Sequence, residues 1–399
     1  MNISTRARRL TASPIRKLVP FANAAKAEGK KVYHLNIGQP DIATSPAFMQ
    51  AVKDFDAKVI AYGDSKGDPK LIDAIARYYD KYGANYRPEH IHITNGGSEA
   101  LILAIQATCD PGDEVLLFEP FYANYATFVT QSSARVVTVS TCVEDGYRLP
   151  TRAEIEKHIT SNTQAIIITN PGNPTGVVLT KEEMRMISDL VLKYDLTLIT
   201  DEVYREFCYE GEFKSFAAMP ELEQNLVMVD SVSKRFSACG ARIGCVISKN
   251  EMFNQQIIKF CQARLCCPTL EMHAATALYE TNADYFSNMK KEYQLRRDTL
   301  VASLKELEGV EFAVPQGAFY LMVKLPVDDA EKFAIWMLQD FDVAGETVMF
   351  APGNGFYGNP QFGQQEARLA YVINSEDIKK AIYILGEGLK KYPGRIKND

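Results

Sequence analysis

Short apolar runs alternate with helical patterns between about residues 70 and 250 of the chain. The predicted strands are 91–94, 114–118, 135–139, 165–169, 196–200, 226–230 and 243–247. Each run is hydrophobic at successive positions rather than at alternate ones, which is typical of strands that are covered on both faces. The pattern therefore predicts an α/β fold in which a mostly parallel, seven-stranded sheet lies between helix layers.

Two segments between the strands carry clear helix-start signals. Asp68 precedes Pro69 and the run "KLIDAIARYYDKY", so Asp68 is the expected N-cap and Pro69 begins the first turn. Thr180 stands in the same way before "KEEMRMISDLVLKY". Parallel strands require crossover helices of this kind, because the chain must return to the same end of the sheet between them.

The pattern changes after about residue 250. Long helical segments follow, including 285–307, and a short strand region at 317–325 precedes two further helical stretches. We interpret this part as a smaller α+β domain that the N-terminal arm partly completes. The predicted division is an arm at 1–45, a large domain at 46–285 and a small C-terminal domain at 286–399.

Composition narrows the class of partner. The 399 residues are 46% hydrophobic, which suits one large core and a smaller domain. Lys and Arg total 44 against 50 Asp and Glu, and the net charge of −6 argues against a nucleic-acid or anionic-membrane partner. No apolar run approaches the ~18 residues needed to span a bilayer. A small-molecule partner is therefore favoured.

The cysteines and the N-terminus indicate a cytoplasmic protein. Eight cysteines occur without a paired C-x-x-C spacing, as expected of free thiols in a reducing compartment. The neighbouring Cys266 and Cys267 are better explained by packing than by a redox role. The first 20 residues lack the apolar segment of a signal peptide, and an arm on a partner subunit is favoured over an organellar presequence.

Polar residues with chemical potential follow the predicted strands, and parallel α/β sheets bind ligands at the carboxyl ends of their strands. After 91–94 comes "NGGSEALILAI", where Ser98 opens a helix whose free N–H groups suit an anion. After 165–169 comes "NPGNPTG", a rigid loop that presents Asn170 and Asn173 as neutral hydrogen-bonding groups. Taken singly, a Gly-Gly turn and a Pro-rich loop are also ordinary structural features.

The next two strand ends carry charged and phenolic groups. Asp201, which follows 196–200, can pair with a buried cationic nitrogen, and Tyr204 can hydrogen-bond an oxyanion. After 226–230, the residues Ser231, Ser233 and Arg242 suit a phosphate dianion. Lys234 is the candidate amine, and we expect a partly desolvated, cation-rich pocket to lower its proton affinity.

Together these strand ends supply the complement of one cofactor. They offer a phosphate clamp, a carboxylate for a ring nitrogen, a phenol and an amide for a ring oxygen, and an amine for an aldehyde. That inventory describes pyridoxal 5′-phosphate, an electron sink that attaches to proteins through a lysine. Asp201 alone would be an ordinary helix N-cap, so the inference depends on the combination.

At this point the sequence resembles the class I/II, fold-type-I pyridoxal-phosphate aminotransferases, and most closely their bacterial aspartate/aromatic branch. The resemblance runs from "LNIGQPD" (35–41) to "ARLAYV" (367–372). It is carried by "NPGNPTG", "DEVY" and "SVSKRF" with "GARIG" at these separations.

The resemblance implies roles for individual residues. Lys234 would be the Schiff-base lysine and proton shuttle, and Asp201 and Tyr204 would complete the catalytic group. The implied cofactor-binding residues are Gly97, Ser98, Tyr122, Asn173, Asp201, Tyr204, Ser231, Ser233, Lys234 and Arg242, with Tyr62 reaching the phosphate of a neighbouring subunit. The implied substrate-binding residues are Gly38, Asn173 and Arg368, of which Arg368 grips the α-carboxylate.

The implied activity is ping-pong transamination between an L-amino acid and a 2-oxo acid. The expected acceptor is 2-oxoglutarate, the expected donor is aspartate or an aromatic amino acid, and the expected assembly is a homodimer with shared active sites. A related bacterial subgroup reads a distal carboxylate with a lysine where this chain has Ser98. The sequence leaves five other candidate side-chain readers: Arg16, Lys17, Asp64, Lys66 and Asn124.

Several other functions are excluded or remain open. The chain has neither the GxxxxGK[ST] motif of a phosphoryl-transfer enzyme nor the GxGxxG of a dinucleotide dehydrogenase. The histidines of "EHIH" (89–92) lack an evident third ligand, so no metal is expected. A pyridoxal-phosphate-dependent carbon–sulfur β-lyase and a cofactor-binding regulator without turnover are the remaining alternatives.

Overall fold

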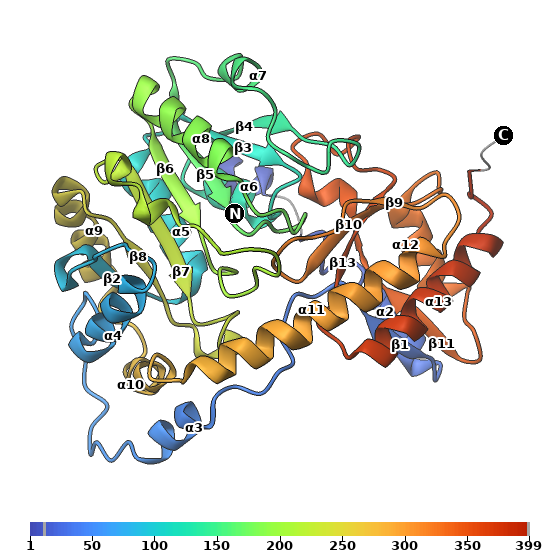
Figure 1. Cartoon of the computed structure of the whole chain (residues 1–399), viewed down its shortest axis with the longest axis horizontal. Helices are drawn as coiled ribbons and strands as arrows, with labels where there is room; N and C mark the ends of the chain where they lie inside the picture. Colours follow the sequence, from blue (N-terminus) through green and yellow to red (C-terminus); the bar gives the residue numbers. More distant parts are fainter. Residues whose placement is uncertain (11–12, 397–399) are drawn as a thin grey trace.

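The computed structural model describes residues 1–10 and 13–396, and its main feature is a seven-stranded sheet (Figure 1). The strand order is β2-β8-β7-β6-β5-β3-β4. β8 is antiparallel to both β2 and β7, and every other pair is parallel. The bounds are β2 Ile91–Thr94, β3 Glu114–Glu119, β4 Arg135–Ser140, β5 Thr163–Thr169, β6 Thr197–Asp201, β7 Leu226–Ser231 and β8 Gly244–Ile247. The predicted mostly parallel sheet is confirmed.

Helices cover both faces of this sheet, which explains the continuous hydrophobic runs. In β5, Ala165 and Ile167 pack against α5, α6 and α9, whereas Ile166 and Ile168 pack on the side of α4, α8 and α10. Successive side chains of a strand point to opposite faces, so both sets must be apolar. The helices are α4 Pro69–Asp80, α5 Gly96–Thr108, α6 Asn124–Gln131, α8 Lys181–Tyr194, α9 Glu251–Arg264 and α10 Thr269–Leu278.

The two predicted helix starts are confirmed. The Asp68 carboxylate accepts hydrogen bonds from the backbone N–H groups of Lys70 and Leu71, with Pro69 as the first residue of α4. Thr180 caps α8 and forms a capping box with Glu183. These caps satisfy N–H groups that would otherwise lack partners at the helix ends.

A second group of elements lies beside the first sheet (Figure 1). Four strands are ordered β12-β13-β10-β9, and β1 pairs in parallel with β11. Figure 1 shows α11 running from the first sheet toward this group. The strands are β1 Lys31–His34, β9 Glu311–Phe312, β10 Tyr320–Lys324, β11 Glu346–Met349, β12 Ala351–Pro352 and β13 Glu366–Ala370. The helices are α11 Ala283–Lys305, α12 Ala330–Gln339 and α13 Ser375–Lys391.

The N-terminal residues belong partly to this second group. β1 and α2 (Val19–Ala27) contribute Val32, Ala22 and Ala25 to the same apolar core as α12 and α13. The remaining short helices are α1 Thr5–Arg9, α3 Pro46–Lys53 and α7 Arg152–Glu156. The domain division at 1–45, 46–285 and 286–399 stays a prediction.

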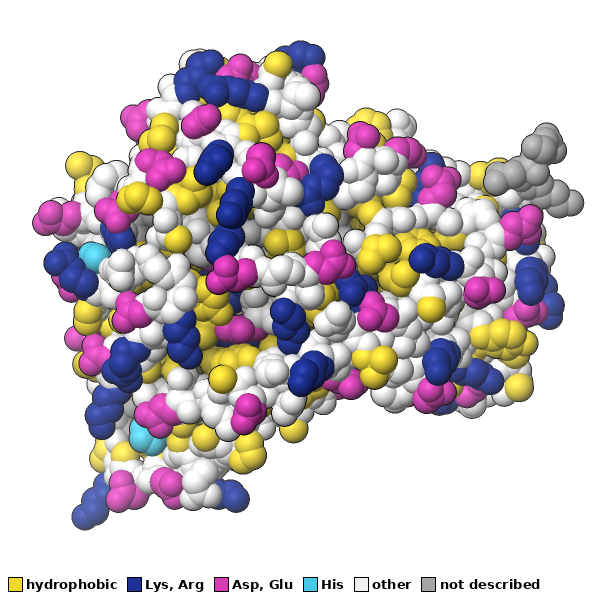
Figure 2. Space-filling view, viewed as in Figure 1, with side chains coloured by type: hydrophobic (Ala, Val, Ile, Leu, Met, Phe, Trp, Pro, Cys, Tyr) yellow, Lys and Arg dark blue, Asp and Glu magenta, His cyan; other side chains and the backbone are white. Residues whose placement is uncertain are grey.

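Surface charge and thiols complete the description of the fold. Figure 2 shows acidic and basic side chains interspersed over the face that carries α11. No helix in the described part of the chain is both long enough and apolar enough to cross a membrane. All eight cysteines are free thiols, and the sulfur of Cys267 lies 2.7 Å from Nη1 of Arg264.

A glycine lets the start of α5 pack directly on the strand ends. Gly244, the first residue of β8, pairs with Thr94 on one side and with Ser231 on the other. A Cβ atom at position 244 would lie 2.6 Å from the carbonyl carbon of Gly96 and 2.7 Å from the nitrogen of Gly97. This close approach therefore leaves no room for a side chain.

We predict that Gly244→Ala destabilises the protein, because the added methyl group must displace backbone atoms of α5. The expected loss in the free energy of unfolding is about 1–3 kcal/mol, measured by denaturant titration. Gly240→Ala is the matched control, since a Cβ at position 240 meets no atom within 4 Å. Equal stability of the two variants would contradict the close-packing argument.

Candidate active site

A cavity of about 510 Å³ opens at the carboxyl ends of β5, β6 and β7. Thr169, Asp201 and Ser231, the last residues of these strands, line it together with residues from the arm and from β13. The predicted site residues that line this cavity are Gly38, Gly97, Ser98, Tyr122, Asn173, Asp201, Tyr204, Ser231, Ser233, Lys234, Arg242 and Arg368. The structure therefore brings together every predicted site residue except Tyr62.

The end of the cavity at α5 is built to hold an anion. Gly97 and Ser98 lie in the first turn of α5, where backbone N–H groups point outward. Arg242 approaches this turn from the side, and its Nη2 donates a hydrogen bond to the carbonyl of Asn95 at 3.4 Å. Gly96 has a φ of +77°, which favours glycine, and a Cβ at this position would also displace the Arg242 guanidinium. With the hydroxyls of Ser231 and Ser233, this end suits a phosphate dianion.

Asp201 is a buried carboxylate without a cationic partner among the described residues. Its Oδ2 accepts a hydrogen bond from the Tyr125 hydroxyl at 2.8 Å, and its Oδ1 accepts one from the backbone of Val203 at 3.3 Å. Burial raises the pKa of Asp201 to about 6, although both hydrogen bonds lower it. A cation placed against Asp201 would relieve this unfavourable burial of charge.

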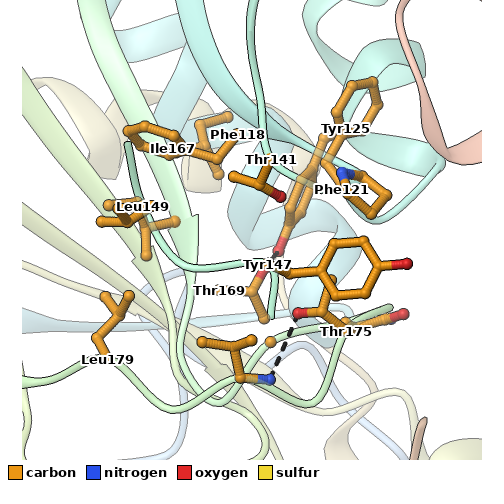
Figure 3. Close-up of a pocket in the computed structure, with 15 residues that line it drawn as sticks. Phe118, Phe121, Tyr125, Thr141, Tyr147, Leu149, Ile167, Thr169, Thr175 and Leu179 are labelled. Atoms are coloured by element: carbon orange, nitrogen blue, oxygen red, sulfur yellow. Dashed lines mark hydrogen bonds between the residues drawn. The ribbon is translucent and has the colours of Figure 1, made fainter. Parts of the chain in front are cut away.

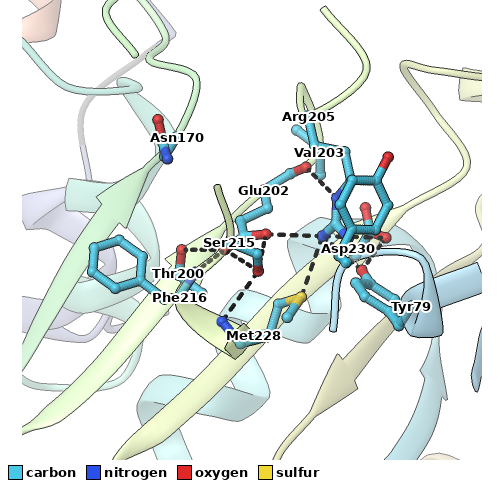
Figure 4. Close-up of polar contacts among 12 residues, drawn as sticks. Tyr79, Asn170, Thr200, Glu202, Val203, Arg205, Ser215, Phe216, Met228 and Asp230 are labelled. Atoms are coloured by element: carbon cyan, nitrogen blue, oxygen red, sulfur yellow. Dashed lines mark hydrogen bonds and ion pairs between the residues drawn. The ribbon is translucent and has the colours of Figure 1, made fainter. Parts of the chain in front are cut away.

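Two neighbouring buried acids, Asp230 and Glu202, differ from Asp201 because each has an arginine as partner (Figure 4). The Arg235 guanidinium makes two hydrogen bonds to Asp230, at 2.7 and 2.8 Å, and Arg205 lies 3.2 Å from Glu202. Ser215 also donates to Glu202 at 2.8 Å. Burial raises the pKa of Asp230, but Arg235 and Arg205 outweigh that effect and hold it below its ordinary value. Both acids therefore have a cationic partner within the chain, although burial still raises the pKa of Glu202. Asp201 has no ion-pair partner among the described residues and can bind a cationic ligand.

Lys234 points into the cavity, and its Nζ donates a hydrogen bond to the carbonyl of Gly38 at 3.0 Å. The expectation that the pocket lowers its proton affinity is wrong. Burial does lower the pKa of Lys234, but Tyr320, Cys239 and Tyr122 outweigh it, so the pKa lies above its ordinary value. The cationic residue Arg368 opposes them only in part. Sequence reasoning placed Tyr122 in the site but not Tyr320, which raises the pKa most.

Arg368 is fully buried and has donor capacity left over. Its Nη2 donates to the carbonyl of Asn36 at 2.7 Å, and its Nη1 donates to Oδ1 of Asn173 at 3.1 Å. Its Nε has no hydrogen-bond partner in the described part of the chain, and the guanidinium lies 4.5 Å from the ring centre of Tyr320. Burial lowers the pKa of Arg368. A guanidinium held by neutral groups alone is suited to bind a carboxylate.

Asn173 links this arginine to the phenols of the cavity. Its Nδ2 donates to the Tyr204 hydroxyl at 3.3 Å, and the hydroxyls of Tyr204 and Tyr320 are 3.1 Å apart. Asn170 does not line the cavity, because its Oδ1 accepts from the backbone of Leu179 at 3.1 Å. Of the two asparagines in "NPGNPTG", one therefore faces the site and the other holds the loop.

Part of the cavity wall is aromatic, at Tyr122 and Tyr125. Asn124 donates to the Tyr122 hydroxyl at 2.7 Å, and the rings of Tyr122 and Tyr125 meet edge to face at 5.3 Å. Behind Tyr125 lies a second, smaller cavity of about 60 Å³, lined mainly by apolar side chains (Figure 3). Figure 3 shows Tyr125 reaching Thr169, with which it shares a hydrogen bond. This packing shields the Asp201 carboxylate from bulk water on that side.

The five candidate side-chain readers separate into two groups. Arg16 and Asn124 line the cavity. Lys17 instead pairs with Glu331, and Asp64 accepts a hydrogen bond from the backbone of Lys66 at 2.7 Å. Within the described residues, only the first group can touch a molecule in this cavity.

Tyr62 lies apart from the cavity and is 82% exposed. It borders a shallow depression with Ile60, Arg264 and Cys266. Within one chain it therefore does not reach the residues that it was predicted to join. Its role across a subunit boundary stays a prediction.

Sequence reasoning missed three residues of the site. Tyr125 donates to Asp201, Asn36 accepts from Arg368, and Tyr320 contacts both Tyr204 and Arg368. Tyr125 could have been considered, because it lies only three residues after Tyr122 at the start of α6. Tyr320 could not, because its place depends on the antiparallel pairing of β10 with β13, which no local pattern reveals.

Comparison with known proteins decides the family. Residues 30–382 match the sequence model described as aminotransferase class I and II. The chain belongs to this family. It is therefore an aminotransferase of fold type I, as the sequence motifs predicted.

Individual relatives agree with this assignment. The aspartate aminotransferase of Thermotoga maritima is 31% identical over 380 residues, which cover 94% of this chain and 97% of that protein. The aromatic-amino-acid aminotransferase 2 of Thermococcus litoralis is 28% identical, covering 98% and 99% of the two chains. Among solved structures, the alanine aminotransferase from Pyrococcus furiosus superimposes with a TM-score of 0.90 at 29% identity, covering 98% and 100%.

The charge imbalance at Asp201 predicts a stability effect in the cofactor-free aminotransferase. A folded-state pKa of about 6, against an ordinary value of 3.8, means that the folded protein binds this proton more tightly than the unfolded chain. The stabilisation is complete below about pH 4 and is lost as the pH rises through 6. Asp201→Asn should therefore raise the free energy of unfolding at pH 8 by up to about 3 kcal/mol, with no gain below pH 4.

Asp230→Asn is the contrasting variant for the same denaturant titrations. It leaves the Arg235 guanidinium buried without its carboxylate, so we expect a loss of about 3–5 kcal/mol. A destabilised Asp201→Asn protein at pH 8 would contradict the view that Asp201 is an uncompensated charge.

Proposed function

We propose that this aminotransferase moves the amino group of an L-amino acid to 2-oxoglutarate or a similar 2-oxo acid, with pyridoxal 5′-phosphate as cofactor. The observation that carries the proposal is Asp201, a buried carboxylate that lacks a cationic partner within the described residues and lines the cavity of Lys234. A protonated pyridine nitrogen supplies the missing positive charge.

The residues present fit this cofactor. Its phosphate would lie at the start of α5, between Arg242 and the hydroxyls of Ser98, Ser231 and Ser233, with the N–H of Gly97. Asp201 would hold the ring nitrogen in its protonated form. The proposed partners of the ring oxygen are Tyr204 and Asn173, and Tyr122 would cover one face of the ring. Lys234 would attach covalently at the aldehyde carbon.

When bound, pyridoxal 5′-phosphate supplies an electron sink for the electron pair left at the substrate Cα. Arg368 would bind the α-carboxylate through its fork of donors, assisted by Asn173 and Gly38. A two-point grip fixes the direction of the Cα–H bond, which determines the bond that breaks. The Nζ atom of Lys234 would then accept the proton from Cα. Because the pKa of Lys234 is raised in the free chain, the amine must first lose its own proton.

The assembly proposed for this function is a cytoplasmic homodimer. Val59, Ile60 and Tyr62 are 75%, 70% and 82% exposed, and they follow one another closely in the chain. A cluster of exposed apolar side chains is typical of an interface, and a second subunit would cover it. In that arrangement Tyr62 would reach the phosphate site of the partner subunit.

We predict that the purified protein with pyridoxal 5′-phosphate absorbs visible light, and that Lys234→Ala abolishes both this absorption and turnover. Asp201→Ala should keep the cofactor but lower turnover by about 10²- to 10⁴-fold, since the ring nitrogen loses its proton. The spectrum and the rate are measured on the same samples. Lys379→Ala, on the exposed side of α13, is the control and should match the parent protein. Full activity in either active-site variant would refute the assignment.

A second measurement distinguishes transfer from elimination. A screen of L-amino acids with 2-oxoglutarate should yield glutamate and the matching 2-oxo acid in equal amounts, because transamination conserves the amino group. Release of ammonia with pyruvate would instead identify a carbon–sulfur β-lyase. Binding of the cofactor without any product would identify a regulator.

A further inference from the structure

The cavity of the active site contains more positive than negative charge. The basic side chains that line it are Arg16, Lys234, Arg242 and Arg368, and the acidic one is Asp201. In the proposed function, the cofactor phosphate faces Arg242, the substrate α-carboxylate faces Arg368, and Asp201 faces the ring nitrogen. Lys234 would be bonded to the aldehyde carbon of the cofactor, so Arg16 is then the one cation of the described cavity lining that has no assigned role.

The chain around Arg16 is held firmly in place. On one side, Pro14 is buried so closely against Gly355 that a Cβ on that glycine would overlap its ring. On the other side, Lys17 pairs with Glu331, which also accepts a hydrogen bond from Asn354 at 2.9 Å.

The backbone of this segment is equally well anchored. The backbone N–H groups of Arg16 and Lys17 both donate to the carbonyl of Ser13, at 3.1 and 3.2 Å. Leu18, which follows directly, is buried in the core with 1% exposure. Arg16 is thus presented by a fixed turn and not by a loose arm.

The Arg16 side chain itself is free to bind a ligand. The residue is exposed yet lines the cavity, which places it at the mouth. No carboxylate of the described residues lies within 4 Å of its guanidinium, in contrast to the ion-paired Lys17 beside it. Because the guanidinium stays hydrated there, its presence costs little, and an incoming carboxylate gains a charge-assisted hydrogen bond.

Asn124 and Ser98, the other cavity-lining positions considered for reading the substrate side chain, are less suited to this role. The Asn124 amide is already engaged with Tyr122, and Ser98 lies at the phosphate end. Ile15 and Ile37 also line the cavity and offer apolar contact for a short chain of methylene groups.

We propose, on the basis of the proposed function, that Arg16 binds the distal carboxylate of a dicarboxylic substrate while Arg368 binds its α-carboxylate. The substrates are then aspartate or glutamate as donor and 2-oxoglutarate as acceptor. Arg16 is the specificity-determining residue for that class. Monocarboxylic amino acids use the same site but leave Arg16 unpaired.

The test compares substrates with one and two carboxylates in the cofactor-loaded protein. Arg16→Gln should lower kcat/KM for aspartate, glutamate and 2-oxoglutarate by about 10- to 150-fold, the worth of a hydrogen bond between charged groups. The values for alanine and pyruvate should change by less than about threefold, because these substrates do not reach Arg16. Arg9→Gln removes the same charge from α1, outside the cavity lining, and should leave every substrate unchanged.

Binding gives a readout that does not depend on turnover. Calorimetric titration with maleate, an unreactive dicarboxylate, should show a similar 10- to 150-fold loss of affinity in Arg16→Gln, whereas propanoate should bind equally to both proteins. Visible absorption and thermal unfolding verify that the variant is folded and loaded with cofactor.

The possible outcomes separate the two proposals. Unchanged values for aspartate and 2-oxoglutarate in Arg16→Gln would overturn the role of Arg16. An equal loss for alanine and aspartate would overturn it as well, because it would indicate a general effect on the site. If the parent protein turns over alanine but not dicarboxylic substrates, the role of Arg16 is likewise overturned, but the proposed aminotransferase function is not. Absence of turnover with every amino acid, in contrast, would be a failure of the proposed function itself.

Discussion

The buried carboxylate of Asp201 is the constraint on which the site depends. A negative charge enclosed by protein is unfavourable unless a cation or several donors compensate it. Here two hydrogen bonds, from Tyr125 and the backbone of Val203, and the charge of Lys234 compensate it only in part, and burial raises the pKa to about 6. The folded chain thus buries the Asp201 carboxylate without an ion-pair partner among the described residues. The free energy lost in this way is available to a ligand that brings a positive nitrogen.

Neighbouring residues at the end of β7 point to opposite sides, one side facing the cavity (the near side) and the other facing the protein interior (the far side). Asp230 and Ser231 are neighbours in β7, yet Asp230 is neutralised by Arg235, whereas Ser231 lines the cavity. Likewise Lys234 enters the cavity, while the next residue, Arg235, is fully buried among aromatic rings. Each charged group on the far side has its partner within the chain. Among the described residues, the groups that line the cavity have no ion-pair partner, and β7 with the turn that follows it therefore serves both stability and binding.

The sequence predicted the first sheet well because its strands are buried on both faces and read as continuous apolar runs. It also predicted the ring of strand-end residues, since parallel strands deliver their last residues to one edge. It could not predict Tyr320, whose position depends on how β10 pairs with a strand more than 40 residues later. For the same reason the direction of the Lys234 pKa shift was wrong. That shift is a sum over neighbours, and Tyr320 is the largest of those that raise it.

The proposed cofactor contacts and the proposed substrate contacts come largely from different parts of the chain. The proposed cofactor contacts come from the strand ends of the first sheet, at Asp201, Ser231 and Lys234. The proposed substrate contacts come mainly from the arm and from β13, at Arg16, Gly38 and Arg368, and Asn173, which follows β5, belongs to both sets. Substitutions in the second set can change the accepted side chain without disturbing the first, because specificity belongs to the site and not to the fold. This separation explains how proteins named as aspartate, aromatic and alanine aminotransferases can all resemble one chain at 28–31% identity.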